Sequence, residues 1–198
     1  MTTRNQKHIQ ALLDLASVAD QAEGLSWYER ASYAAIRLAD QYEIKEEQAA
    51  GVIAALSPRN KWDRNLLDAE NLIAAYVAGG AEAAADVKVC TFGKNKTKAI
   101  EILESAYADG GVFAILSGPK LKEFYSCIRG FQDVCIDGHA YSIWFGDRVT
   151  LAKVPSIGVK LRAEIKKDYL AVAKKNNLTG AQVQAITWVA HRRIHGVG

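Results

Sequence analysis

Residues 46–56, with the sequence EEQAAGVIAAL, decide the fold class. Beyond its first three residues this stretch is apolar on nearly every side of a helix, so we expect a helix that is buried all round. Ser57-Pro58 ends it, because a proline disfavours the helical conformation in the residue before it. The periodicity is also helical nearly throughout the rest of the chain, which predicts an all-α protein.

The other expected helices follow from apolar residues at helical spacing. We expect one helix across residues 9–16 and another that begins near Trp27, with Ser26 as its N-cap. Further helices are expected at residues 62–78, 94–108, 120–128, 138–145, 157–176 and 180–195. No segment of useful length alternates between polar and apolar residues, so strands are at most incidental.

Length and composition exclude several classes of protein. The chain has 198 residues, of which 49% are hydrophobic and 3 are proline, so it can bury a core and is neither disordered nor collagenous. No apolar stretch approaches the roughly 20 residues that span a bilayer. The N-terminus leads into an amphipathic stretch rather than a signal peptide. We therefore expect a cytoplasmic protein without a membrane partner.

The net charge of +3 conceals an uneven distribution. Residues 1–150 carry 16 positive and 20 negative side chains, whereas residues 151–198 carry 9 positive and 2 negative ones. Such asymmetry is typical of a basic face that binds a polyanion, although a helix surface in contact with solvent explains it equally well.

The cysteines and histidines do not form the pattern of a metal site. Cys90, Cys127 and Cys135 are odd in number and include no CxxC pair, so we expect buried thiols rather than disulfides, a zinc site or an iron–sulfur cluster. The 4 histidines make no metal set either. The sequence predicts neither a metal nor a cofactor.

Two short motifs can carry chemistry. Leu116–Lys120 (LSGPK) places a glycine turn before a helix that opens with lysine, and the backbone N–H groups of such a turn suit a phosphate oxygen. In residues 134–139 (VCIDGH), an apolar run delivers Asp137 to the start of a helix. Taken singly, the first motif can be an ordinary turn, and Asp137 can be an N-cap and nothing more.

Together the two motifs indicate chemistry at a sugar. Lys120 and Asp137 are 17 residues apart, with one helix and a turn at Gly130 between them, so the chain can fold back and bring both side chains to one cleft. A carboxylate there can stabilise the charge of an oxocarbenium ion or deprotonate the nucleophile, and the lysine amine can itself be the nucleophile.

Four segments resemble, in the same order, the helix-hairpin-helix, Gly/Pro-rich-loop, aspartate superfamily of DNA base-excision glycosylases. They are Gly51–Asn60 (GVIAALSPRN), Phe92–Ala99 (FGKNKTKA), Leu116–Lys120 and Val134–His139. In this comparison Asp137 takes the place of the family's catalytic aspartate, and Lys120 that of the lysine in members that also cleave the DNA strand. The resemblance rests on the order and spacing of short motifs.

The resemblance implies one two-lobed helical domain, with residues 46–146 in one lobe and residues 1–45 plus 147–198 in the other. Its implied partner is a DNA duplex with one flipped nucleotide, and we expect a monomer. The residues expected to contact DNA are Arg59, Asn60, Lys94, Lys96, Gly118, Lys122 and His139, and those expected to line the base pocket are Phe124, Tyr141 and Trp144.

The chain also departs from the family pattern. The hairpin has one glycine, Gly118, where the family has two, and Pro58-Arg59-Asn60 replaces a common glutamine pair. We expect a glycosylase that releases a damaged or modified base, with strand cleavage by Lys120 as a variant, and keep two alternatives. One is a phage transferase that acts on hypermodified thymine with the same fold, located in the host cytoplasm. The other is a DNA-binding module without catalysis.

Overall fold

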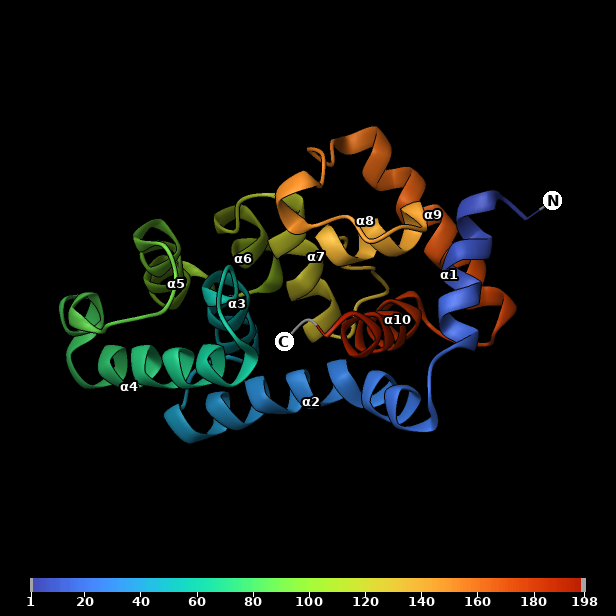
Figure 1. Ribbon diagram of the computed structural model, residues 1–198. Helices are drawn as coiled ribbons and strands as arrows, with labels where there is room; N and C mark the ends of the chain where they lie inside the picture. Colours follow the sequence, from blue (N-terminus) through green and yellow to red (C-terminus); the bar gives the residue numbers. More distant parts are fainter. Residues whose placement is uncertain (1, 197–198) are drawn as a thin grey trace. The chain divides into compact units, whose positions relative to one another are not determined.

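α-Helices make up most of the chain in the computed structural model, which describes residues 2–196 (Figure 1). They are α1 (Arg4–Asp14), α2 (Val18–Tyr42), α3 (Glu46–Leu56), α4 (Trp62–Asp86), α5 (Gly93–Ser105), α6 (Asp109–Ile115), α7 (Pro119–Ile128), α8 (Gly138–Phe145), α9 (Val159–Lys175) and α10 (Gly180–His195), with a short 3-10 helix, η1, at Leu151–Lys153. No strand occurs among the described residues, which confirms the all-α class for them. Within the same residues, no helix is both long and apolar enough to cross a membrane.

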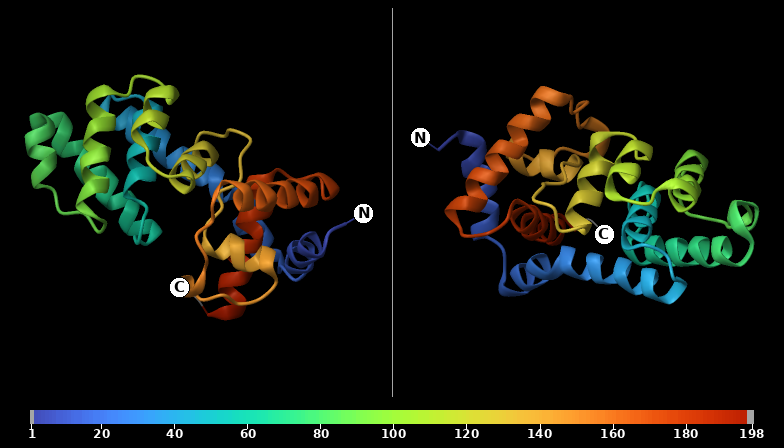
Figure 2. Two further views of the ribbon diagram at one scale, coloured as in Figure 1. Left: turned by 90° about the horizontal axis from the view of Figure 1, so that it is seen from above. Right: turned by 180° about the vertical axis from the view of Figure 1, so that it is seen from behind.

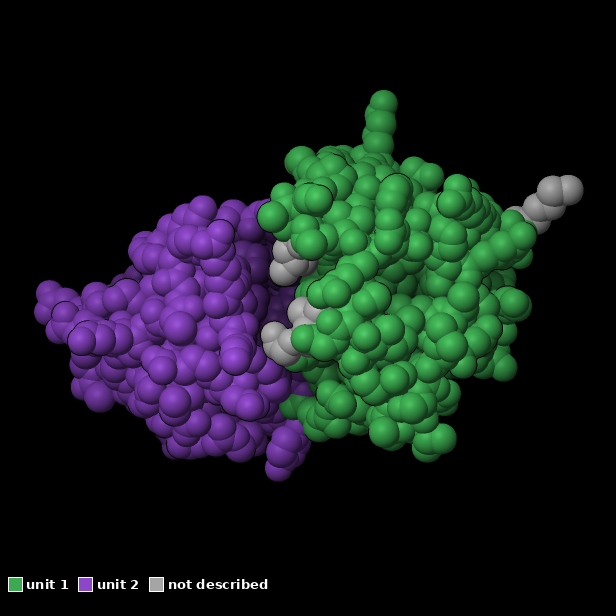
Figure 3. Space-filling view, viewed as in Figure 1, with its two compact units in different colours: residues 1–30, 130–198 green, residues 31–129 purple. Residues whose placement is uncertain are grey.

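The chain divides into two compact units (Figure 3). The terminal unit contains residues 1–30 and 130–198, and the central unit contains residues 31–129. These boundaries differ from those of the expected lobes, which were residues 46–146 and the remainder of the chain. Asp137 belongs to the terminal unit and Lys120 to the central unit.

The central unit is built around α3. Every residue of this helix from Gln48 to Leu56 is buried, as its apolar sequence predicts, and α4, α5, α6 and α7 pack against it. Gln48 donates to the carbonyl of Leu103 (2.8 Å), and Asn65 of α4 donates to the carbonyl of Ile53 (3.0 Å). The burial of these amide nitrogens costs little because each has a backbone partner.

Most helix boundaries follow the sequence closely. α3, α8 and α10 begin and end where the pattern predicts, and Thr179 caps α10 by accepting a hydrogen bond from the N–H of Gln182 (3.1 Å). Gly79 and Gly80 have non-helical backbone angles, so α4 is interrupted at the predicted place, and a short further helical piece follows to Asp86.

The expected helix start at Ser26 is wrong. α2 begins at Val18, where Ser17 and Asp20 each accept a hydrogen bond from the other's backbone N–H. Ser26 lies inside α2, and its hydroxyl donates to the carbonyl of Ala22 (3.0 Å), one turn back along the helix. A serine can either cap the start of a helix or, inside a helix, donate to the carbonyl one turn back. Its neighbours in the sequence do not distinguish these two roles.

In the terminal unit, α1, α8, α9 and α10 pack around one apolar core (Figure 2). Ile9 of α1, Ile136 before α8 and Tyr169 of α9 are fully buried in it. The first part of α2 lies so close to α10 that a Cβ placed on Gly24 would be 2.4 Å from the Cα of Ile186. A glycine at position 24 therefore permits the close approach of two helix backbones.

We expect Gly24→Ala to lower the free energy of unfolding by about 1–3 kcal/mol, because the added methyl group meets backbone atoms of α10 that cannot rotate away. Gly110→Ala is the matched control, since Gly110 also lies in a helix and an added Cβ there meets no atom within 4 Å. Urea denaturation measures both variants. A Gly24→Ala protein as stable as the wild type would contradict this packing.

Candidate functional site

Asp137 lies at the junction between a buried extended segment and α8. Val134 and Ile136 are fully buried ahead of it, and Asp137 itself is partly buried. Its backbone is extended, and its carboxylate accepts a hydrogen bond from the N–H of Ala140 (2.9 Å), which confirms the predicted N-cap. The positive end of the helix dipole stabilises a negative charge at this position.

Helix α9 holds the segment that carries Asp137. Its contacts with this segment are the guanidinium of Arg162 with the carbonyl of Ile136 (2.9 Å), the ammonium of Lys166 with the carboxylate of Asp133, and the hydroxyl of Tyr169 with the carbonyl of Ala140 (3.2 Å). These bonds fix the chain on both sides of Asp137. The carboxylate is therefore positioned by the packing of the terminal unit.

Three histidines gather where residues of α8 and α10 meet, and one of them, His191, is close enough to Asp137 for the carboxylate to affect its pKa. The ring centroids of His139 and His191 are 5.6 Å apart, and those of His191 and His195 are 4.4 Å apart. His191 and His195 are one turn apart on α10, a spacing that could have signalled this pair in the sequence. His139 comes from a distant part of the chain, so sequence spacing did not reveal the whole group. Among residues 2–196, no set of three or more potential ligand side chains is arranged to hold a metal ion.

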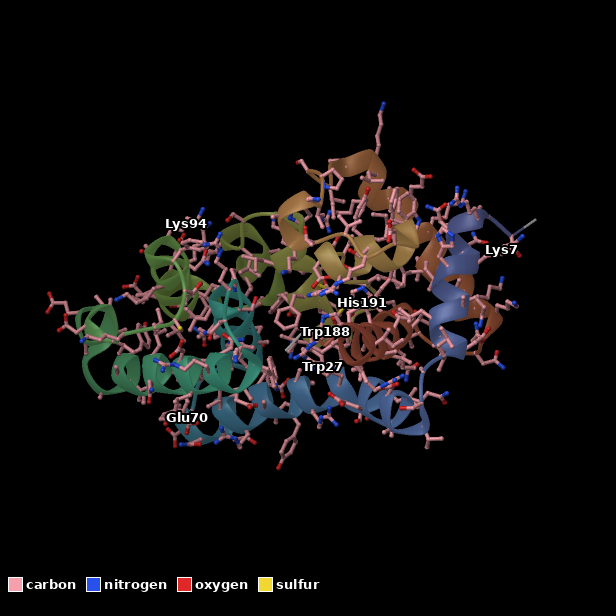
Figure 4. The ribbon with its side chains drawn as sticks, viewed as in Figure 1. Lys7, Trp27, Glu70, Lys94, Trp188 and His191 are labelled. Atoms are coloured by element: carbon pink, nitrogen blue, oxygen red, sulfur yellow. The ribbon has the colours of Figure 1, made fainter. Side chains whose placement is uncertain are left out.

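His191 is the buried member of this histidine group and is labelled in Figure 4. It is 6% exposed, and its Nδ1 atom has no hydrogen-bond partner among the described residues. Its pKa is lowered to about 4, first by burial and then by the neighbouring His195 and His139, against the opposite effect of Asp137. At neutral pH the group therefore contains a neutral imidazole near the carboxylate.

The same part of α10 carries aromatic and cationic side chains. Trp188 precedes His191 by one turn, and the guanidinium of Arg192 lies 4.4 Å from the centroid of the Trp188 ring. Trp27 of α2 contacts Trp188 edge to face, with ring centroids 5.9 Å apart (Figure 4). Indole rings and a guanidinium are groups that stack on nucleobases. No motif in the sequence pointed to these residues as part of a site.

The three aromatic residues expected in a base pocket do not lie in one unit. Tyr141 and Trp144 are buried in the core of the terminal unit, where the indole N–H of Trp144 donates to Asp168 (2.8 Å). Phe124 lies in the central unit, where its ring contacts Trp62 edge to face at 6.4 Å. Core packing accounts for Tyr141 and Trp144, and contact with a base stays a prediction for all three.

In the central unit, a glycine turn connects α6 to α7, as the hairpin motif predicts. Gly118 has a φ of +83°, which residues with a side chain rarely adopt, and Pro119 is the first residue of α7. Lys120 and Lys122 follow in the first turn, Lys120 exposed and Lys122 partly buried. This end of α7 combines a helix N-terminus with an exposed lysine, a combination suited to a phosphate.

Two loops of the central unit bring cations to an exposed aromatic ring. Arg59, after α3, and Lys94, in the first turn of α5, lie 5.0 Å and 5.9 Å from the ring centroid of Phe92. Phe92 is 44% exposed, and the hydroxyl of Thr91 donates to the carbonyl of Pro58 (2.9 Å), which joins the loops. The sequence predicted Arg59 and Lys94 as DNA contacts. It missed Phe92, because one aromatic residue before a helix gives no sign of exposure.

Asn60 and Lys96, two other expected DNA contacts, form bonds inside the central unit. Asn60 donates to the carboxylate of Asp68 (2.9 Å), and Lys96 donates to the carbonyl of Val87 (3.1 Å). Asp68 is fully buried and also accepts a hydrogen bond from the N–H of Cys90 (2.7 Å). These bonds hold the loops in place, and contact of either residue with DNA stays a prediction.

The model of the family described as "Family of unknown function (DUF7178)" matches residues 1–195. No curated protein and no solved structure matches the chain.

The buried histidine predicts how stability depends on pH. The pKa of His191 is about 4 in the folded protein, below its ordinary value of 6.5, so the unfolded chain takes up a proton first as the pH falls. The resulting stability is present above pH 6.5 and is lost between pH 6.5 and 4, by up to about 3 kcal/mol. Urea denaturation across this pH range measures the free energy of unfolding. In His191→Gln, the part of its decrease in acid that comes from His191 should be absent.

His8→Gln is the control, since it changes a histidine of α1 outside the cluster. This variant should lose stability in acid as the wild type does. If the stability of His191→Gln fell with pH in parallel with the wild type, the low pKa of His191 would be refuted.

Proposed function

Because the chain belongs to DUF7178, a family of unknown function, we propose its activity from its own residues: it cleaves the N-glycosidic bond of a flipped, damaged or modified base in DNA. The observation that carries this proposal is the carboxylate of Asp137, fixed at the N-terminus of α8 near the neutral imidazole of His191. When a glycosidic bond breaks, positive charge develops at C1′ of the sugar, and a fixed carboxylate stabilises it. The resemblance of four segments to DNA glycosylases supports the same assignment.

In the proposed reaction, the bond between C1′ and the base nitrogen breaks and water adds to C1′. Asp137 accepts the proton that the water loses, and the departing base takes up a proton in turn. His191 stays neutral at neutral pH because it is buried, so it adds no positive charge that would oppose the developing oxocarbenium ion. A carboxylate with an uncharged imidazole nearby is therefore suited to this step.

Lys120 is the proposed nucleophile of a variant reaction. Attack of its amine on C1′ displaces the base, and loss of a proton from the amine with opening of the sugar gives a Schiff base. β-Elimination from the Schiff base then cleaves the strand. The place of Lys120 next to the Gly118 turn supports this role, because the turn can bind the phosphate beside the sugar that reacts.

The ring of Phe92 with Arg59 and Lys94 supports nucleic acid as the partner. Cations that bond phosphate oxygens position a protein on DNA without reading its sequence, and exposed aromatic rings stack on unpaired bases. Both kinds of group occur here within one small part of the central unit.

We expect Asp137→Asn to reduce base release at least about 100-fold without unfolding the protein. Asparagine caps a helix as well as aspartate does, so the fold is retained while the negative charge is lost. The measurement is release of free base from a panel of oligonucleotides with damaged or modified bases. Asp147→Asn, in the exposed loop after α8, is the matched control and should keep full activity.

The same assay separates the alternatives. Full activity of Asp137→Asn would remove this carboxylate from the mechanism. A nucleoside whose mass changes without release of a base would indicate the transferase instead. Salt-dependent DNA binding without turnover, unchanged in Asp137→Asn, would indicate a module that only binds.

Borohydride trapping tests Lys120. If Lys120 forms the Schiff base, reduction should give a covalent adduct with a lesion oligonucleotide, and Lys120→Ala should abolish it. Lys122→Ala should weaken binding but keep the adduct, because Lys122 lies in the same turn without the proposed chemistry. An adduct that persists in Lys120→Ala would refute the proposed role of Lys120 as the nucleophile.

A further inference from the structure

The outer face of α9 carries a row of lysines. Lys160, Lys167 and Lys174 follow one another at intervals of seven residues, which places them on one face of the helix about 10 Å apart. All three are exposed, and among the described residues none of them forms an ion pair or a hydrogen bond. We propose that this lysine row binds the phosphate backbone of a DNA duplex.

The spacing favours a polymer over a small anion. Ammonium groups about 10 Å apart on a rigid helix cannot all meet on one phosphate group. Duplex DNA carries one negative charge per about 1.7 Å of its axis, so a row about 20 Å long faces several phosphates at once. Each lysine can then neutralise a phosphate of its own.

The surroundings of the lysine row are also basic. Of the two acidic residues in α9, Asp168 is buried and accepts a hydrogen bond from Trp144, so Glu164 is the exposed carboxylate of this helix. A groove of about 350 Å³ between α1 and α9 has Lys7, which is labelled in Figure 4, Lys175 and the exposed Asp14 among its lining residues. The row therefore continues toward two further lysines, and the nearby exposed carboxylates that oppose it are Glu164 and Asp14.

An anionic membrane is the other large surface that a row of lysines could meet. A helix that binds a membrane interface inserts an apolar face among the lipids. The apolar face of α9, with Ile165, Tyr169 and Val172, is instead buried in the core of the terminal unit. A nucleic acid, which needs only the exposed charges, fits this helix better.

The lysine row is fixed relative to Asp137, because α9 also holds the segment before α8 through Arg162 and Lys166. A duplex bound along the row would be held at a constant distance from the carboxylate. This binding depends on charge alone and does not rest on the proposed glycosylase reaction.

The test measures the affinity of the full chain for an undamaged duplex of about 30 base pairs, by fluorescence anisotropy at several salt concentrations. Replacing all three lysines, as in K160Q/K167Q/K174Q, should reduce the slope of log K against log salt by about 2.7, or about 0.9 for each lost phosphate contact. At about 0.1 M salt, the affinity should fall at least about tenfold. Thermal unfolding should change little, because the three exposed side chains form no ion pair or hydrogen bond with the described residues.

Two control variants separate the effect of the lysine row on DNA binding from the effect of total charge. K160R/K167R/K174R keeps the charges and should bind as the wild type does, and K45Q/K88Q removes two exposed lysines from the central unit and should leave the slope nearly unchanged. A wild-type slope in the triple glutamine variant would overturn the proposal. So would binding to vesicles with about 30% phosphatidylserine that depends on these lysines while DNA binding does not.

The two proposals can fail separately. If no oligonucleotide loses a base but the salt slope still depends on the lysine row, the glycosylase proposal fails and the DNA surface stands. If Asp137→Asn abolishes base release while the triple glutamine variant binds DNA as the wild type does, the DNA surface fails and the glycosylase proposal stands.

Discussion

The packing of α9 against the segment before α8 is the contact on which the functional features of the terminal unit depend. The inner face of α9 supplies Tyr169 to the core, and its edge supplies Arg162 and Lys166 to the backbone and carboxylate next to Asp137. One helix therefore fixes the candidate catalytic carboxylate and carries the lysine row. A substitution that loosened α9 would disturb both features at once.

Burial gives opposite properties to the basic side chains of this unit. His191 of α10 is buried, and desolvation keeps it neutral at neutral pH. Lys160, Lys167 and Lys174 instead lie exposed to solvent on the outer face of α9. The unit thus places an uncharged imidazole near Asp137, where charge would oppose the proposed chemistry, and concentrates positive charge where a polyanion can reach it.

The sequence predicted those features that depend on neighbouring residues. The buried helix 46–56 was identified from its continuous apolar composition, and Asp137 was identified as an N-cap from the apolar run before it and the helix after it. Ser26 shows the limit of this reasoning, because a serine before an aromatic residue can cap a helix or bond to the turn behind it. Which of the two occurs depends on whether the residues before the serine already belong to the helix.

The sequence by itself determined the all-α class, most helix boundaries and the position of Asp137 at the start of α8, since periodicity and capping act within a few residues. Only the tertiary structure brought His139 to His191, placed Trp144 in the core beside Asp168, and set Arg59 beside Phe92. These pairs join residues far apart in the chain. Such pairs form when separate helices and loops pack together. The spacing of residues within one helix or loop carries no information about that packing.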